Sequence, residues 1–212
     1  IFAYTNLNAY QFDFLTVRDV VSKVKKKFKK LKTLQATFTV ISKKGGKVTR
    51  QNGRIRYKSR DKLMIRFYNG QKIVSNGKMM WIYIPSLNVV AEQDLNSKLG
   101  FFGKSSSGLK RLFMKYHYKF ASKQQPEQTK EGKFYTLLLK QKESRSGFRR
   151  IKLWISEKYM IKKAQGQSST GKNVQILFTN IRTNIPIKNG VFKFDIPSHA
   201  RVIKNPMMSE VK

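Results

Sequence analysis

The spacing of apolar residues changes once along the chain, and the change separates a helix from a series of strands. Between residues 17 and 31 apolar side chains recur with helical spacing, while lysines from Lys23 to Lys30 occupy the other face. Thr16 and Asp19 match a capping box, so we predict a helix that begins at residue 17. Such a helix either docks on its own sheet with its charges in water or lies on anionic lipid.

From Leu34 onward, apolar and polar residues alternate in short segments, with turn signals about every 8–12 residues, which predicts an antiparallel sheet or barrel. The dipeptides Asn69-Gly70 and Asn76-Gly77 are typical of hairpin turns, and the second favours a type I′ turn. We predict strands at 36–40, 48–57, 63–68, 71–75, 79–84, 87–93, 116–121, 134–140, 148–155, 159–167 and 174–185, with 192–194 and 196–197 closing the pattern.

The segment Met79–Ile84 is apolar at every position, unlike a strand with one face in water. It fits either a central core strand or a strand between protein and an apolar cavity.

Residues 94–115 interrupt the strands with two short apolar helices that glycines and serines separate. This arrangement fits either a movable lid or an ordinary surface insertion. The apolar residues on the two helical faces are Leu95, Leu99 and Phe102, and then Leu109, Leu112 and Phe113.

No stretch has the composition of a linker, so we predict one domain over residues 16–203. An N-terminal arm at 1–15 precedes it, and a polar tail at 204–212 follows. The first three residues, Ile1-Phe2-Ala3, fit the end of a cleaved export signal.

The charge balance is strongly basic, with 45 lysines and arginines against 11 acidic residues and a formal net charge of +34. Such a field attracts polyanions and anionic membrane surfaces. There is no cysteine, which excludes disulfides, thiolate metal sites and cysteine nucleophiles. No run of apolar residues is long enough to span a bilayer as a helix.

No constellation of residues indicates catalysis. His117 and His199 are far apart in sequence and lack nearby carboxylates, and no phosphate-binding loop or nucleophile elbow is present. We therefore expect a protein that is not an enzyme and that has no metal and no cofactor. Basic residues alternate with aromatics at 54–57 and 115–119, but no nucleic-acid-binding motif accompanies them, so nucleic acid is not an expected partner.

Five segments resemble the LolA family of periplasmic outer-membrane lipoprotein carriers in their order and spacing. The likeness runs from about residue 16 to residue 203, and Asn76, Asp61 and Val89 depart from the family's usual Asp, Pro and Gln. The segments are Leu34-Gln35-Ala36-Thr37-Phe38, Gly53-Arg54-Ile55-Arg56-Tyr57-Lys58, Ile73-Val74-Ser75-Asn76-Gly77-Lys78-Met79-Met80-Trp81-Ile82-Tyr83-Ile84-Pro85, Ile176-Leu177-Phe178-Thr179-Asn180 and Phe192-Lys193-Phe194-Asp195-Ile196-Pro197.

The resemblance implies a mainly β fold with lid helices (α+β), in which an incomplete antiparallel β-barrel (half-barrel) has helices covering its concave face. It implies a periplasmic chaperone that holds the acyl chains of lipoproteins and carries them from the inner to the outer membrane. The expected partners are lipoproteins, an inner-membrane lipoprotein-releasing transporter, an outer-membrane acceptor and, transiently, an anionic membrane surface. We expect a monomer. The alternatives are an outer-membrane receptor of the LolB type, or a basic module that binds nucleic acid or anionic lipid.

The resemblance also implies the residues of the site. Arg60 is expected to hold the lid closed by donating hydrogen bonds to backbone carbonyls of the lid helices. Met64 is expected to lie at the cavity mouth, where a partner would bind. Because Trp81 and Tyr83 share strand parity, we place both inside the cavity. The expected lining is Phe38, Ile55, Tyr57, Leu63, Ile65, Trp81, Tyr83, Leu95, Leu99, Phe102, Leu109, Leu112 and Phe113.

Overall fold

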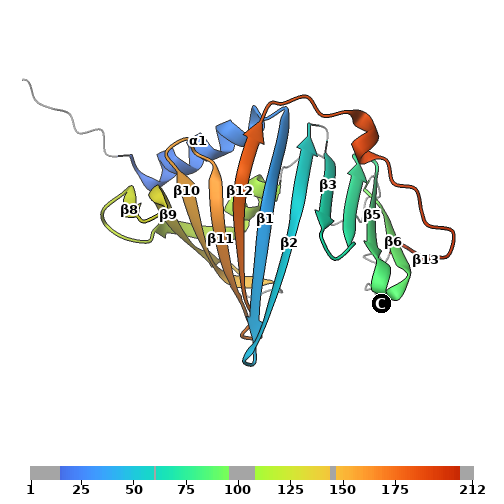
Figure 1. The fold of residues 1–212 in the computed structure, drawn as a ribbon. Coiled ribbons are helices and arrows are strands. Elements are labelled where there is room, and N and C mark those ends of the chain that lie inside the picture. Colours follow the sequence, from blue (N-terminus) through green and yellow to red (C-terminus); the bar gives the residue numbers. More distant parts are fainter. Residues whose placement is uncertain (1–14, 60, 96–107, 144–146, 206–212) are drawn as a thin grey trace, which may run out of the picture.

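The computed structural model describes residues 15–59, 61–95, 108–143 and 147–205, in which thirteen strands form one sheet beside two α-helices (Figure 1). In chain order the elements are α1 (Val17–Lys29), β1 (Thr33–Lys44), β2 (Lys47–Lys58), β3 (Lys62–Phe67), β4 (Lys72–Asn76), β5 (Met79–Ile84), β6 (Val89–Asp94), α2 (Gly108–Lys115), β7 (Tyr116–Phe120), β8 (Glu127–Thr129), β9 (Gly132–Gln141), β10 (Phe148–Ser156), β11 (Ile161–Ser168), β12 (Asn173–Thr183) and β13 (Arg201–Lys204), with short 3₁₀ turns at Pro85–Leu87 and Asn189–Phe192.

The sheet consists of two antiparallel meanders that meet where β1 pairs with β12. Its order is β13-β6-β5-β4-β3-β2-β1-β12-β11-β10-β9-β7, with β8 beside β9. Every pairing is antiparallel except that of β13 with β6. Because β13 and β7 do not pair with each other, the sheet stays open, and the prediction of an incomplete barrel is confirmed.

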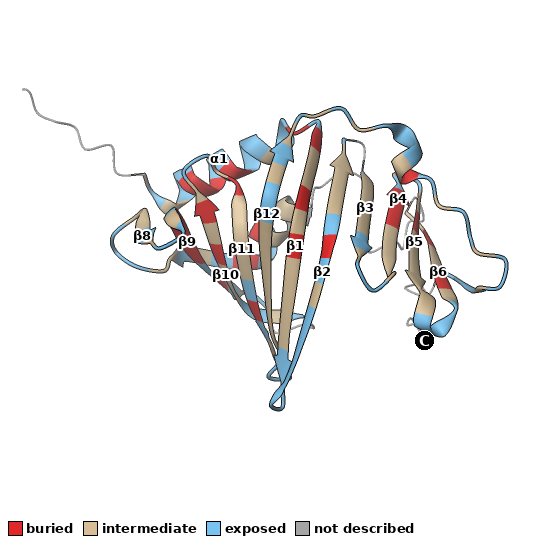
Figure 2. Cartoon of the chain, viewed as in Figure 1, coloured by how far each residue is buried: buried red, intermediate tan, exposed pale blue. Residues whose placement is uncertain are grey.

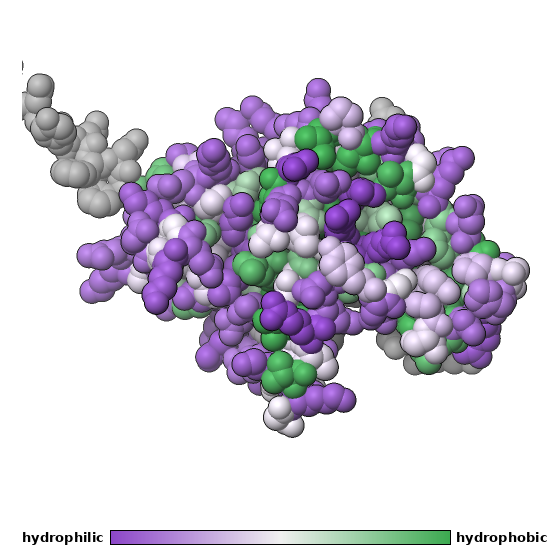
Figure 3. All heavy atoms as spheres, in the orientation of Figure 1, coloured by the Kyte–Doolittle hydropathy of each residue, from purple (hydrophilic) through white to green (hydrophobic). Residues whose placement is uncertain are grey.

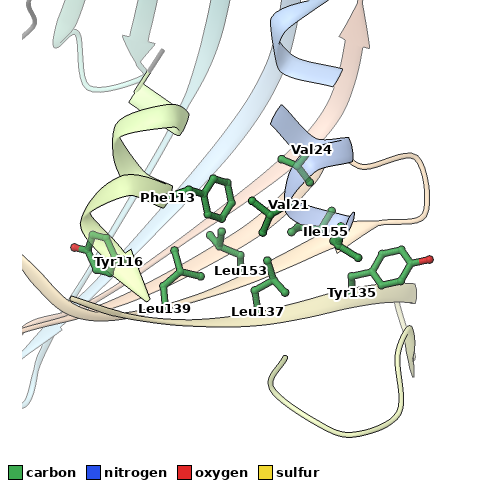
Figure 4. Packing of buried hydrophobic residues seen from close by; sticks show 10 residues of the cluster. Val21, Val24, Phe113, Tyr116, Tyr135, Leu137, Leu139, Leu153 and Ile155 are labelled. Carbon is green, nitrogen blue, oxygen red and sulfur yellow. The ribbon is translucent and has the colours of Figure 1, made fainter. Parts of the chain in front are cut away.

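Both helices lie on one face of the sheet, which we call the inner face; the opposite face is the outer face (Figure 1). The apolar stripe of α1 packs on β9 and β10 through Val20, Val21 and Val24, each at most 2% exposed. Figure 4 shows Phe113 of α2 and apolar side chains of these strands packed against Val21 and Val24 of the helix. The lysines from Lys23 to Lys30 are exposed, so docking on the sheet is the correct alternative for this helix.

The start of α1 matches the prediction as well. The Asp19 backbone N–H donates to Thr16 Oγ1 at 3.2 Å, and the Thr16 N–H donates to Asp19 Oδ2 at 2.9 Å. This reciprocal pair is the capping box, which satisfies two of the N–H groups that a helix start leaves free. Figure 2 shows buried positions on α1 and on the strands packed against it, and exposed positions at the tip of the β1–β2 hairpin.

The loop between β3 and β4 decides which residues of β4 to β6 face inward. The Phe67 N–H donates to the Gln71 carbonyl at 2.9 Å, so the loop holds three residues, 68–70. The Gly70 N–H closes the turn on the Phe67 carbonyl, and Gly70 takes a φ of 91°, the left-handed conformation that ends such a loop. A two-residue loop at Asn69-Gly70 would have shifted the register by one, and a shift of one exchanges the two faces of every following strand.

The prediction that Trp81 and Tyr83 face the cavity is therefore wrong. Ile65 pairs with Ile73 and Ile73 pairs with Ile82, so the even-numbered residues of β5 share the inner face. Trp81 and Tyr83 point to the outer face, where both contact Phe194 at ring-centroid distances of 6.0 and 6.2 Å.

The type predicted for the Asn76-Gly77 turn also differs from the structure. Gly77 has a φ of 94°, but Asn76 does not have a positive φ, so the β4–β5 turn is not type I′. Instead Asn76 Oδ1 accepts hydrogen bonds from the backbone N–H groups of Lys78 and Met79, at 2.8 and 2.9 Å. These hydrogen bonds hold the turn without the positive φ at Asn76 that a type I′ turn requires.

The structure also differs from the prediction near the C-terminal end of the domain. Residues 192–194 and 196–197 are not strands, because Asn189–Phe192 is a 3₁₀ turn and the following segment crosses the outer face. Lys204 belongs to β13, and the Asn205 N–H donates to the Glu92 carbonyl, so the ordered domain extends beyond residue 203. The predicted arm, apart from Leu15, and residues 206–212 of the predicted tail lie outside the described residues.

Candidate binding cavity

A cavity of about 350 Å³ lies between the inner face of the sheet and the two helices. It is lined almost entirely by apolar side chains, and Asp61 is the single charged residue on its border among the described residues. The lining residues are Phe28, Leu31, Leu34, Ala36, Ile55, Tyr57, Asp61, Leu63, Leu109, Met160, Ile161, Phe178 and Ile181.

The floor of the cavity is built by direct cross-strand pairs, which place their side chains on the same face. Ala36 of β1 pairs with Ile55 of β2, and Tyr57 pairs with both Leu34 and Leu63. Ala36 is one of the lining residues, and its side chain is only a methyl group, so it projects little volume from the sheet into the cavity. The volume beside it is available to an apolar ligand.

A β-bulge in β12 brings two further residues into the cavity. Phe178 and Ile181 are three positions apart, so in a regular strand they would face opposite sides. Asn180 takes a φ of 50°, and the β1–β12 register shifts between Gln35 and Thr37. The bulge turns Ile181 inward beside Phe178.

Two polar residues, Tyr57 and Asp61, border the cavity. Burial raises the pKa of the Tyr57 hydroxyl, and the neighbouring Asp61 carboxylate raises it further, so Tyr57 stays neutral at physiological pH. Asp61 has a φ of 60°, and its backbone carbonyl accepts a hydrogen bond from Ser75 Oγ at 3.0 Å. The Asp61 carboxylate would repel another anion at this border, while the apolar walls suit a hydrocarbon chain.

The structure brings together four of the predicted cavity residues, Ile55, Tyr57, Leu63 and Leu109. Phe38 and Ile65 lie on the same inner face beyond the cavity, and the Phe38 ring packs edge-on against Phe67 at 5.2 Å between centroids. Leu112 and Phe113 do not border the cavity; they belong to the core below α1.

Other predicted residues lie elsewhere. Met64 is on the outer face, because it pairs with Arg56 and Val74, so the placement at the cavity mouth is wrong. Leu95 directly follows β6, and its N–H donates to the Lys78 carbonyl, so it is not part of a helix. Arg60, Leu99 and Phe102 are outside the described residues.

Sequence reasoning missed the lining residues from α1, β1, β11 and β12. Phe28 and Leu31 lay on the predicted apolar stripe of the helix, so their spacing already indicated an inward position. Phe178 and Ile181 carried no equivalent signal, because their common orientation depends on the bulge at Asn180.

No group of three or more histidine or acidic residues is placed to hold a metal ion within the described parts of the chain. In the same residues no helix is both long and apolar enough to cross a membrane.

Comparison with known proteins finds similarity to outer-membrane lipoprotein carrier proteins. The family model described as "Outer membrane lipoprotein carrier protein LolA" matches residues 29–195. An outer-membrane lipoprotein carrier protein of Legionella pneumophila (strain Lens) is 27% identical over 188 residues, which cover 84% of this chain and 86% of that protein. A crystal structure of an uncharacterized conserved protein from Thermus thermophilus has a TM-score of 0.58 at 13% identity, covering 88% of this chain and 98% of that one.

Proposed function

Because the chain belongs to the LolA family of outer membrane lipoprotein carrier proteins, we propose that it binds the acyl chains of lipoproteins in the cavity between α1, α2 and the sheet. It would carry them through the periplasm from an inner-membrane lipoprotein-releasing transporter to an outer-membrane acceptor. The observation that carries the proposal is the apolar lining of the cavity, drawn from five strands and both helices.

The energetics of hydrocarbon burial explain why such a carrier needs an enclosed site. Each buried methylene contributes about 0.8 kcal/mol, so acyl chains do not leave a membrane for water unless a protein offers comparable burial. The cavity of about 350 Å³ is near the lower end of the ~300–1,000 Å³ range of small-molecule sites. We infer that α2 moves outward as longer chains enter, because α2 covers the sheet through few side chains such as Leu109 and Phe113.

For cargo to be released, the conformation in which α2 covers the empty cavity must compete in free energy with the cargo-bound conformation. We propose Arg60 as the latch of the covered conformation, since a guanidinium can donate to several helix carbonyls at once. This role predicts that Arg60→Leu holds cargo longer than the parent does.

The binding role can be tested with a fluorescent triacylated lipopeptide and the same peptide without acyl chains. Ile55→Glu introduces a carboxylate into the cavity lining, and Leu138→Glu makes the same kind of change on the outer face of β9, where Leu138 is 37% exposed. Loss of contact with two methylenes, at about 0.8 kcal/mol each, weakens binding by about tenfold. We expect this loss for Ile55→Glu and unchanged binding for Leu138→Glu.

A second variant separates added charge from loss of space. Ala36→Phe fills the cavity with carbon and should also weaken binding, while circular dichroism checks that each variant is folded. Binding of the acylated peptide that is equal in the parent, Ile55→Glu and Ala36→Phe would refute the assignment of this cavity, and equal binding of the non-acylated peptide would refute lipid recognition.

A further inference from the structure

The outer face of the sheet carries a second hollow, of about 380 Å³, that differs from the apolar cavity in its chemistry. Three arginines line it, Arg54 and Arg56 from β2 and Arg66 from β3. Met64 and Tyr68 are also part of its wall, and the Tyr68 side chain is 62% exposed. We call this hollow the arginine groove.

The register places like charges directly opposite each other along the groove. Arg54 pairs with Arg66, and Arg66 pairs with Lys72 of β4, so three cations lie in one row across adjacent strands. Directly opposed like charges destabilise a sheet. Within the described residues no carboxylate forms an ion pair with any of the three, so this part of the chain does not neutralise the row.

Arg56 extends the cluster to the neighbouring row of the same face. Its Nε donates to Gln35 Oε1 at 3.0 Å, a contact that orients the guanidinium without neutralising it. Figure 3 shows strongly hydrophilic side chains gathered over β2 and β3 on the viewed face. Lysines on a flat surface would be separately solvated, whereas these arginines border a common hollow with an apolar wall.

We propose that the arginine groove is an anion-binding site that takes a phosphate group. Guanidinium groups bind phosphate oxygens in bidentate fashion, and several of them around one hollow satisfy a dianion better than a single lysine does. A bound phosphate would also relieve the repulsion between Arg54 and Arg66. The phosphate can belong to a phospholipid headgroup or to a soluble compound, and the site is independent of the acyl-chain cavity on the other face.

The test uses the full chain and inorganic pyrophosphate in isothermal titration calorimetry. In about 0.15 M NaCl the Debye length is ~8 Å, so the general field of the protein is largely screened. The groove variant is Arg54→Gln with Arg66→Gln. The matched control is Arg149→Gln with Arg150→Gln, two exposed arginines on β10, which removes the same charge elsewhere.

We expect the groove variant to lose at least about tenfold in pyrophosphate affinity and the control to change by less than about twofold. Pyrophosphate should also raise the melting temperature of the parent and the control more than that of the groove variant. Equal losses in the two double variants, or no measurable binding by the parent, would overturn the proposal.

A vesicle arm identifies the source of the phosphate. Vesicles of phosphatidylcholine with phosphatidylglycerol are compared with vesicles of phosphatidylcholine alone. If the groove variant alone loses binding to the anionic vesicles, the site takes a lipid headgroup. If the groove variant loses pyrophosphate but keeps the parent's vesicle binding, the site takes a soluble phosphate compound.

Discussion

Substitution of Gly53 by alanine tests how closely the neighbouring strands β1 and β3 pack against β2 at this position. Gly53 lies in β2, directly opposite Phe38 of β1 and Phe67 of β3. A Cβ atom at this position would lie 2.6 Å from Phe38 Cζ and would also collide with the backbone carbonyl oxygen of Arg66. A ring can rotate away from a new methyl group, but a backbone carbonyl held in a ladder cannot.

The magnitude follows from two opposing effects. Overpacking in a filled site costs about 1–3 kcal/mol, and the collision with the Arg66 backbone places Gly53→Ala at the upper end. Replacing glycine by alanine restricts the unfolded chain and returns about 0.4–1 kcal/mol. The net loss is about 2 kcal/mol, which lowers the melting temperature by ~4–8 °C for a chain of this length.

The assay is thermal unfolding followed by circular dichroism on three matched variants. For Gly166→Ala the three nearest atoms to the new Cβ all belong to the Phe148 ring, at 2.6–2.9 Å, and Gly190→Ala meets nothing within 4 Å. We expect the loss of stability to decrease in the order Gly53→Ala, Gly166→Ala, Gly190→Ala, with the last unchanged or slightly stabilised. A melting temperature for Gly53→Ala within about 1 °C of that for Gly190→Ala would refute the reasoning.

Two further predictions concern the outer face and the β8 loop. Phe194→Ala removes a ring that contacts Trp81 and should cost about 2 kcal/mol and red-shift tryptophan fluorescence, whereas the exposed His199→Ala should do neither. Burial opposes ionisation of Glu127, but hydrogen bonds from Thr136 and neighbouring side chains hold the pKa of Glu127 below its usual value. A lowered pKa gives stability that is present above the unfolded value of about 4.3 and lost as pH falls through the folded value. Because solvent screens much of this interaction, Glu127→Gln should unfold at most about 1 kcal/mol more easily at pH 7. Urea titrations should show the difference shrinking in acid; a constant difference contradicts the assignment.

Local patterns predicted the parts of this fold that depend on neighbouring residues. The capping box at Thr16 and the stripe from Val17 to Leu31 predicted α1, since a helix repeats its contacts within a few residues. Alternation predicted most strands of the two meanders, and spacing within 94–115 predicted α2. Three cavity residues, Ile55, Tyr57 and Leu63, followed from strand parity combined with the family's arrangement, and Leu109 followed from helical spacing.

Predictions of which face a residue occupies failed wherever one extra residue intervened. The three-residue loop at 68–70 exchanges the faces of β4 to β6, which moved Trp81 and Tyr83 away from the cavity. The bulge at Asn180 has the opposite effect and adds Ile181 to the lining. Both features change side-chain direction by one position, and a two-residue period carries no information about such an insertion.

The junction of β1 with β12 has a consequence for the order in which the chain folds. β1 lies near the N-terminus, and its partner β12 is among the last strands synthesised, whereas β2 to β6 form by hairpins between neighbours. The apolar stripe of α1 also has no docking surface until β9 and β10 exist. Long-range pairing is slow because loop closure costs entropy before contacts form. We therefore expect the β1–β6 meander to fold early, with α1 undocked, and the zipping of β12 onto β1 to limit the rate.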